Sequence, residues 1–263
     1  MRITIHDLQK MKHNGEPIPV LTCYDYTSAK ILDSVGVPVL LVGDSLGMVV
    51  LGHENTLPVT MDMMIHHCQA VARGAKNALL VFDMPFATCC PEDVRGSLRN
   101  AARALAEGGA QAVKIEGGAA MAPLVTAFVR AGIPVMGHIG MTPQSVYQMG
   151  GFKLQGRDDV AKERLATDAV ALEGAGAFAL VLELVPPELA ARITKHLKIP
   201  TIGIGAGRDC SGQVQVFHDV FGLYEDFVPR HTKRYATVAA TIREAAKVYL
   251  SEVAQGKFPE KQG

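Results

Sequence analysis

The chain has 263 residues, of which 48% are hydrophobic, and its 26 Lys and Arg balance its 26 Asp and Glu, so the formal net charge is zero. This length suits one large domain with an ample core, and the charge balance argues against a nucleic-acid surface, which needs a basic excess. The apolar runs fall far short of the roughly 18–20 residues of a membrane span. We therefore expect no nucleic acid and no membrane among its partners.

The amino-terminal segment and the cysteines both indicate a cytoplasmic protein. Residues 1–7 lack the apolar core of a signal peptide. The five cysteines are odd in number and contain no C-x-x-C pair, so we expect scattered thiols in a reducing compartment rather than disulfides. The adjacent Cys89 and Cys90 could form a redox pair, but two ordinary loop thiols are the simpler interpretation.

Short apolar runs alternate with longer Ala-rich segments of helical period, after an amphipathic helix near Ile5–Met11. Strands are predicted at Val20–Cys23, Val39–Val42, Leu79–Phe82, Ala112–Ile115, Val135–His138, Phe178–Leu182, Thr201–Ile204 and near Val214–Phe217. Helices are predicted at Thr27–Ser34, Met61–Lys76, Glu92–Glu107, Ala122–Ala131, Asp159–Gly174, Pro187–Leu197 and Ala236–Gln255. Start signals agree with these helices, since Thr60 can cap one of them and Pro187 suits a first helical position.

The number of alternations indicates the fold class. Eight strand–helix units in about 250 residues are typical of a (β/α)8 TIM barrel. An open doubly wound sheet is the alternative, but the chain has no early G-x-G-x-x-G fingerprint. We find no linker, low-complexity segment or repeat. The prediction is therefore an α/β protein with one (β/α)8 barrel domain over residues 1–263 and a short amino-terminal helix.

Polar side chains follow six successive predicted strands, at the points where those strands end. They are Asp25, Asp44 with Ser45, Asp83, Lys114 with Glu116, His138, and Glu183. Catalytic groups of barrel enzymes lie at the carboxyl ends of the strands, which open onto one face. The pattern therefore predicts one shared active site.

The carboxylates that follow the second, third and fourth strands need a neutralising partner. Asp44 and Asp83 follow neighbouring strands, which lie about 4.8 Å apart, and carboxylates so close together share a proton or bind a cation. With Glu116 they form an oxygen-only ligand set, which favours Mg²⁺ over zinc. The alternative is an ordinary ion pair between Lys114 and Glu116 with no metal.

Other features leave two interpretations open. Glu183 follows an apolar run, so desolvation would raise the pKa of its carboxyl group and make it a usable base, or else it is simply exposed. His138 either makes a structural hydrogen bond or takes part in catalysis. The glycines of residues 203–207 either cradle a phosphate or allow close backbone approach. His66 and His67 diverge by about 100° on a helix, so we do not expect them to share a metal.

Short motifs are spread in order over essentially the whole chain. They are VGDSLG at residues 42–47, GH and TLPVT within 52–60, DMPF at 83–86, VKIEGG at 113–118, GHIGMTPQS at 137–145, GGFKLQGR at 150–157, GIGAG at 203–207 and FHD at 217–219. Together they resemble the ketopantoate hydroxymethyltransferase family, in the superfamily of phosphoenolpyruvate mutase and isocitrate lyase. The chain departs from the family pattern at Cys89-Cys90 and at residues 208–211, and neither stretch is a catalytic position.

The resemblance implies an enzyme that transfers a hydroxymethyl group from 5,10-methylenetetrahydrofolate to 3-methyl-2-oxobutanoate. The product would be 2-dehydropantoate, in pantothenate biosynthesis. It also implies one Mg²⁺ per subunit, a Mg-stabilised enolate, and a homo-oligomer, commonly a decamer. Two other functions stay open: another lyase or mutase of the superfamily that acts on an oxo acid through a similar enolate, and a non-catalytic metabolite-binding barrel.

The resemblance also implies roles for individual residues at matching positions. The metal ligands would be Asp44, Asp83 and Glu116. The residues that contact the oxo acid would be Asp44, Ser45, Asp83 and Lys114. The catalytic proton acceptor would be Glu183.

Overall fold

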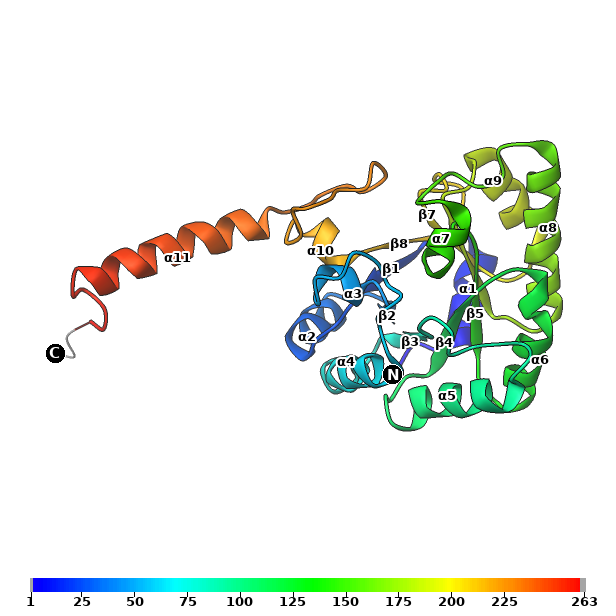
Figure 1. Cartoon of the computed structure of the whole chain (residues 1–263), viewed down its shortest axis with the longest axis horizontal. Helices are drawn as coiled ribbons and strands as arrows, with labels where there is room; N and C mark the ends of the chain where they lie inside the picture. The colour runs from blue at the N-terminus through cyan, green and yellow to red at the C-terminus, as the bar shows by residue number, and fades with distance from the viewer. Residues whose placement is uncertain (1, 261–263) are drawn as a thin grey trace. The chain divides into compact units, whose positions relative to one another are not determined.

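Eight parallel strands close into a barrel in sequence order (Figure 1). The structure is a computed structural model that describes residues 2–260. The strands are β1 (Ile18–Thr22), β2 (Val39–Val42), β3 (Leu79–Asp83), β4 (Ala112–Glu116), β5 (Val135–Gly140), β6 (Ala179–Glu183), β7 (Thr201–Ile204) and β8 (Gly212–Gln215). Because β1 pairs with both β2 and β8, the sheet is closed, which excludes the open doubly wound sheet and confirms the predicted (β/α)8 barrel.

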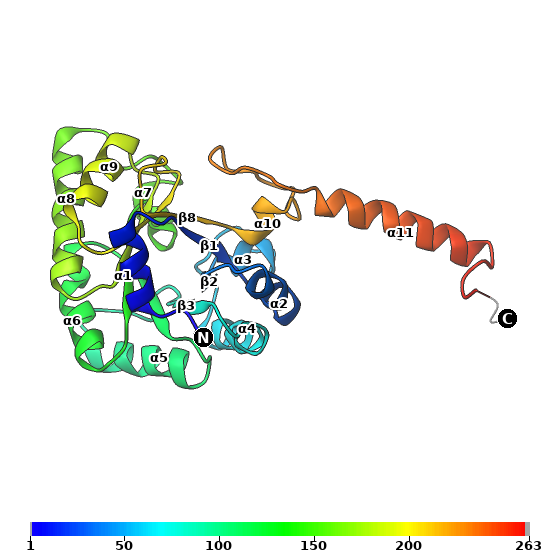
Figure 2. The same ribbon diagram turned by 180° about the vertical axis from the view of Figure 1, so that it is seen from behind.

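Helices connect most of the strands and surround the barrel (Figure 1). They are α1 (Ile5–Asn14), α2 (Tyr26–Ser34), α3 (Leu46–Val49), α4 (Met61–Gly74), α5 (Val94–Ala106), α6 (Ala122–Arg130), α7 (Val146–Met149), α8 (Asp159–Gly174) and α9 (Pro187–His196), with 3₁₀ turns η1 (Ala119–Met121) and η2 (Pro143–Ser145). The predicted amino-terminal helix is α1, which Figure 2 shows against the barrel. Its Leu8 belongs to the buried barrel core. Within residues 2–260, no helix has both the length and the apolar character that crossing a membrane requires.

Side-chain caps fix where several helices begin. The Thr60 hydroxyl accepts a hydrogen bond from the Met63 amide, so the predicted cap of α4 is confirmed. Asp25 does the same for α2, because its carboxylate accepts hydrogen bonds from the Ser28 amide at 2.9 Å and the Ser28 hydroxyl at 2.6 Å. Asp25 is therefore a helix cap, although it also follows a strand.

Strand pairing, rather than apolar content, sets the limits of β1 and β8. The predicted ranges were Val20–Cys23 and Val214–Phe217, but each strand begins two residues earlier, because Ile18 pairs with Gly212. The extra residues of β8 are a glycine and a glutamine. An apolar pattern does not detect such residues, since their strand conformation comes from the neighbouring strand.

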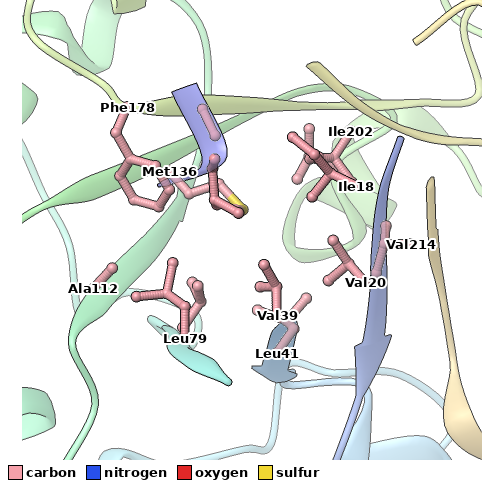
Figure 3. Close-up of a cluster of buried hydrophobic side chains, with 14 residues drawn as sticks. Ile18, Val20, Val39, Leu41, Leu79, Ala112, Met136, Phe178, Ile202 and Val214 are labelled. Carbon is pink, nitrogen blue, oxygen red and sulfur yellow. The ribbon is translucent and has the colours of Figure 1, made fainter. Parts of the chain in front are cut away.

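The barrel interior is filled by apolar side chains that converge from the strands (Figure 3). The cluster consists of Leu8, Ile18, Val20, Val39, Leu41, Leu79, Val81, Ala112, Met136, Phe178, Ala179, Val181, Ile202 and Val214. Side chains alternate between the two faces of a strand. In β3, Leu79 and Val81 face the interior, so the next inward position is Asp83, and the same alternation in β6 leads to Glu183.

The chain divides into two compact units, of which the first ends at Gln215 and the second begins at Val216. All eight strands lie in the first unit. The second contains α10 (Phe217–Val220) and α11 (Val238–Ala254). The expectation of a single domain over the whole chain stays a prediction.

Candidate active site

Charged side chains continue the inward-facing rows of the barrel at the carboxyl ends of its strands. In β4, Ala112 lies in the apolar core, and the next two inward positions are Lys114 and Glu116. In β5, Met136 lies in the core and His138 follows it. The barrel interior therefore changes from an apolar layer to a charged layer along each of these strands, at the end where barrel enzymes place their active sites.

Lys114 lies at the centre of the charged layer. Its ammonium nitrogen is 2.6 Å from Asp83 Oδ1 and 3.6 Å from Glu116 Oε1, and β3 and β4 are in register at Asp83 and Lys114. All three side chains are at most 5% exposed. Burial acts to lower the pKa of Lys114, but the surrounding carboxylates raise it above its ordinary value, so Lys114 is a buried cation.

Gln144, in η2 after β5, holds two of the strand-end carboxylates. Its side-chain amide donates hydrogen bonds to Asp44 Oδ2 and to the Met84 carbonyl, both at 2.9 Å. Its backbone amide donates to Glu116 Oε2 at 3.0 Å. The sequence reasoning missed this residue, although it lies in the quoted motif at residues 137–145. A polar side chain just beyond a buried strand is the signal that could have found it.

The carboxylates outnumber the cations around them. Burial, followed by the charges of Asp83 and Glu116, raises the pKa of Asp44 well above its ordinary value. Burial also raises the pKa of Asp83, against the opposing effect of Lys114. Burial thus disfavours the ionised forms of these two groups, and a bound cation would stabilise both as carboxylates.

The imidazole of His138 lies between two carboxylates. Its Nδ1 is 3.3 Å from Glu116 Oε1, and its Nε2 is 3.3 Å from Glu183 Oε2. These are ion-pair distances, and the angles are too poor for hydrogen bonds. Burial and Lys114 act to lower the pKa of His138, but Glu116 and Glu183 raise it to about 9. His138 is therefore an imidazolium near neutral pH, and it connects Glu183 with the other carboxylates.

Glu183 ends β6 and is followed by an unusual backbone conformation. Its side chain is 14% exposed, the most open of the carboxylates that form these ion pairs. Leu184 has a φ of 46°, in the left-handed region that a leucine rarely adopts. Its amide donates to the Ile204 carbonyl and its carbonyl accepts from the Gln155 amide. The bonds on both sides of Leu184 hold this strained turn beside Glu183.

Ser45 is also at the barrel mouth, but its described contact is with Tyr24. The hydroxyl oxygens of Ser45 and Tyr24 are 2.9 Å apart. A Cβ at Gly43 would lie 2.8 Å from Ser45 Oγ, so a larger residue there would force this hydroxyl to move. Tyr24, which is buried after β1, is a second residue that the sequence did not predict. Its partner Ser45 follows a different strand, so the contact forms only when the barrel closes.

Two sequence features lie apart from this network. A Cβ at Gly207, whose φ is +82°, would lie 2.7 Å from Pro187 Cβ. Close packing against α9 is thus a sufficient reason for this glycine. His67 Nδ1 lies 2.7 Å from the Tyr24 carbonyl oxygen, and its ring meets that of His66 edge-on at 5.5 Å.

Cys89 and Cys90 lie in the loop between β3 and α5, and their environments differ. The Cys90 thiol donates to Glu92 Oε2 at 2.8 Å. Burial raises the pKa of the Cys89 thiol to about 12. A thiol with so high a pKa is a poor nucleophile, which agrees with two ordinary loop thiols.

The carboxylate oxygens at the strand ends are hard donor atoms of the kind that Mg²⁺ prefers. Among residues 2–260, no three His, Cys, Asp or Glu side chains form a ready-made metal cage. Mg²⁺ does not need one, because it usually binds through one or two carboxylates and keeps several waters or substrate oxygens. Glu116 Oε1 is buried without a hydrogen-bond partner, and the Asp44 amide lies 3.4 Å from Asp83 Oδ2. These oxygens fit a hard divalent cation.

The structure thus brings most of the predicted site residues into one network. Gln144 connects Asp44 with Glu116, Lys114 connects Glu116 with Asp83, and His138 connects Glu116 with Glu183. Ser45 lies next to Asp44 in the chain and contacts Tyr24. Their individual roles stay predictions.

A closed parallel barrel with buried charged groups at the carboxyl ends of its strands belongs to the class of barrel enzymes. The chain matches the ketopantoate hydroxymethyltransferase family over residues 2–261. It is 59% identical over 260 residues to the 3-methyl-2-oxobutanoate hydroxymethyltransferase of Chloroflexus aurantiacus, covering 98% of this chain and 91% of that relative. This chain therefore belongs to the ketopantoate hydroxymethyltransferase family.

Solved structures share the fold at low sequence identity. The complex of phosphonopyruvate hydrolase with oxalate and Mg²⁺ aligns with a TM-score of 0.63 and 12% identity, covering 99% of this chain and 90% of that one. The 2,3-dimethylmalate lyase, a member of the PEP mutase/isocitrate lyase superfamily, aligns with a TM-score of 0.61 and 15% identity, covering 100% of this chain and 92% of that one. The likeness to these structures agrees with the predicted barrel fold.

Proposed function

We propose that this chain transfers a hydroxymethyl group from 5,10-methylenetetrahydrofolate to 3-methyl-2-oxobutanoate, forming 2-dehydropantoate for pantothenate biosynthesis in the cytoplasm. The observation that carries the proposal is the convergence of the strand-end carboxylates around Lys114, with His138 and Glu183 facing them. A small anionic substrate needs a cation to hold it and a base to take its proton, and this arrangement supplies both. The names of the relatives support the same reaction.

We propose that the site binds one Mg²⁺ per subunit through Asp44, Asp83 and Glu116. Glu116 Oε1, which accepts no hydrogen bond, and the excess of buried carboxylates support this. When bound, Mg²⁺ would polarise the carbonyl group of the 2-oxo acid and stabilise the negative charge that develops on its oxygen. The distantly related phosphonopyruvate hydrolase was crystallised with oxalate and Mg²⁺, a small carboxylate and the same ion.

Side chains of the barrel would supply the remaining functions, which are substrate binding and proton transfer. Asp44, Ser45, Asp83 and Lys114 would contact the oxo acid, and the positive charge of Lys114 would offset the charge that grows on the substrate oxygens. Glu183 would accept the proton from C3 of the substrate. The resulting nucleophilic carbon would bond to the methylene carbon of the folate, both carbon–nitrogen bonds of that methylene group would break, and water would supply the hydroxyl oxygen, which releases tetrahydrofolate. His138, 3.3 Å from Glu183 Oε2, holds the base in place and balances its charge.

Exchange of the C3 proton in D₂O tests the assignment of the base without any folate. The unmodified chain with Mg²⁺ and 3-methyl-2-oxobutanoate should incorporate deuterium at C3, as followed by proton NMR. Glu183→Gln should slow this exchange by about a hundred-fold or more, because an amide cannot accept the proton. Glu188→Gln, on the surface of α9, is the matched control. Exchange at the unmodified rate in Glu183→Gln would show that another group is the base.

We further propose that the chain forms a homo-oligomer, and specifically a decamer. The family resemblance supports this, and so does α11, which has no buried residue. Its exposed apolar side chains are Ile242, Val248, Tyr249, Leu250 and Val253. The mass measured by light scattering after size exclusion should be ten times that of the chain. A mass of 28.1 kDa would contradict the proposal.

A further inference from the structure

Two loops at the carboxyl ends of the strands form an open pocket beside the active site. One loop follows β2 and the other follows β5. The pocket has a volume of about 500 Å³ and is lined by His53, Glu54, Asn55, Leu57, Pro58 and Tyr147. The Asn55 side-chain amide donates to the Tyr147 hydroxyl at 3.2 Å, so the two loops are joined across the pocket. A volume of this size is typical of small-molecule sites.

Both loops that line the pocket also contain, or directly follow, residues at the barrel mouth. On one side, α3 begins at Leu46, next to Ser45, and the His53 amide donates to the Gly47 carbonyl at 2.8 Å. On the other side, Tyr147 lies in α7, three residues after Gln144, which donates to Asp44. The loops that position the strand-end carboxylates are therefore the same loops that form the pocket.

The carboxylates at the strand ends are buried. Asp44 and Asp83 are 4% and 3% exposed, so only a small part of any substrate contacts them directly. A group transfer to that acid needs a donor molecule whose bulk stays outside while its reactive end reaches in. The open pocket between the loops that follow β2 and β5 is a place where the bulk of such a donor could lie.

The lining of the pocket indicates the chemistry of its occupant. Leu57, Pro58 and the ring of Tyr147 offer apolar surface, and Tyr147 is 76% exposed, so a flat ring can stack on it. Glu54 is exposed, and within residues 2–260 it forms no ion pair. A carboxylate only accepts hydrogen bonds, and its two oxygens match an edge that carries two N–H groups.

We infer that this pocket binds the pterin ring of the one-carbon carrier, with Glu54 accepting hydrogen bonds from the N–H edge of the ring and Tyr147 stacking on its face. The inference rests on the function proposed above, and it assigns the carrier to a site separate from that of the oxo acid. The flat ring and the adjacent N–H groups of a pterin match both features of the lining.

Steady-state kinetics with each substrate varied in turn tests this assignment. Glu54→Gln should raise KM for 5,10-methylenetetrahydrofolate about ten-fold, because a charged acceptor is lost. Tyr147→Ala should raise it about five-fold through the loss of stacking. KM for 3-methyl-2-oxobutanoate should change less than about two-fold in either variant. Direct titration with tetrahydrofolate, the carrier without its one-carbon unit, should give the same ratios of Kd.

Two further variants separate binding from loop structure. Tyr147→Phe removes the hydrogen bond from Asn55 but keeps the ring, so KM for the folate should stay within about two-fold of the unmodified value. Glu188→Gln, on α9, controls for the loss of a surface charge. Equal rises in KM for both substrates in Glu54→Gln and Tyr147→Ala would show a distorted active site and overturn the assignment.

The outcomes also distinguish this inference from the proposed function. The unmodified chain could turn over both substrates while Glu54→Gln and Tyr147→Ala have an unchanged KM for the folate. That result would show that the pocket is wrongly assigned, and the proposed function would stand. If the unmodified chain neither exchanges the C3 proton of the oxo acid nor turns over, the proposed function fails first. Binding of the oxo acid in place of tetrahydrofolate at this pocket would also overturn the inference.

Discussion

A single side chain, Gln144, sets the relative position of two carboxylates that come from different strands. Its two amide groups reach Asp44 and Glu116, which are 100 and 28 residues away in the chain. The sequence predicted that the strand-end carboxylates converge, because parallel strands of a barrel open onto one face. It did not predict Gln144, since the bonds of a loop residue depend on where the loop folds back.

Replacing Gln144 should weaken metal binding. Gln144→Ala removes the side-chain amide that donates to Asp44 Oδ2, while the backbone amide still donates to Glu116. The loss of such supporting hydrogen bonds typically costs about ten-fold in metal affinity. Calorimetric titration with Mg²⁺ in the presence of 3-methyl-2-oxobutanoate measures this directly. Gln69→Ala, on the exposed face of α4, should bind Mg²⁺ as the unmodified chain does, and equal affinity in both variants would contradict the role given to Gln144.

The backbone at Leu184 should respond to substitution according to its left-handed conformation. Asparagine adopts this region more readily than other residues with a Cβ, whereas valine is strongly disfavoured there. Leu184→Val should therefore lower the free energy of unfolding by about 1–2 kcal/mol and slow C3 proton exchange, because Glu183 precedes it. Leu184→Asn should change the exchange rate much less. Similar exchange rates for the two variants would mean that the conformation does not position Glu183.

At the scale of elements, Asp33 joins α2 to the segment before β3. Its carboxylate accepts hydrogen bonds from the amides of Lys76, Asn77 and Ala78 and from the Asn77 side chain, at 2.8–3.0 Å. Burial acts to raise the pKa of Asp33, but these donors together lower it below its ordinary value. The carboxylate therefore stabilises the contact between two elements that are adjacent in the barrel.

The stabilisation by Asp33 should depend on pH. Because its pKa is lower in the folded chain, its contribution is complete above the unfolded pKa of about 3.9 and is lost as the pH falls through the folded value. Asp33→Asn should cost about 2 kcal/mol at pH 7, and the difference from the unmodified chain should shrink below about pH 4. Urea unfolding at several pH values measures it. A difference that stays constant down to pH 3 would contradict the assigned pKa shift.

The limits of an element could be predicted from the sequence where local burial or a cap sets them, and not where distant partners do. β2 and β7 match their predicted ranges, because their apolar residues are buried by the barrel itself. α8 likewise begins at Asp159, where Asp158 caps it. The limits of β8 and the bonds of Gln144 were not predictable, because both depend on partners that are distant in the sequence.

At the scale of the whole molecule, the first unit is a barrel with an apolar layer below a charged layer. The cysteines report how completely this unit is packed. Cys23 and Cys68 are fully buried, and burial raises the pKa of each thiol to about 12. Thiol reactivity at these positions therefore measures opening of the structure rather than local chemistry.

Native thiol labelling should be incomplete at Cys23 and Cys68. At pH 8 a thiol with so high a pKa is ionised in about one molecule in ten thousand, and the packing also excludes the reagent. Labelling with an aromatic disulfide, followed by peptide mass spectrometry, should modify Cys90 within minutes and leave these two thiols unmodified until urea is added. Rapid labelling of Cys68 in the native state would show that α4 opens locally.

The alternation of inward and outward side chains has a consequence for how this barrel can change over evolutionary time. The core residue Ala112 and the charged residues Lys114 and Glu116 share one face of β4. Shifting the pairing register of this strand by one residue would turn all three outward together. Stability and catalysis would thus be lost together. Both core packing and the placement of the charged residues therefore constrain the lengths of the strands. The loops carry no such double constraint, so insertions and deletions should accumulate there.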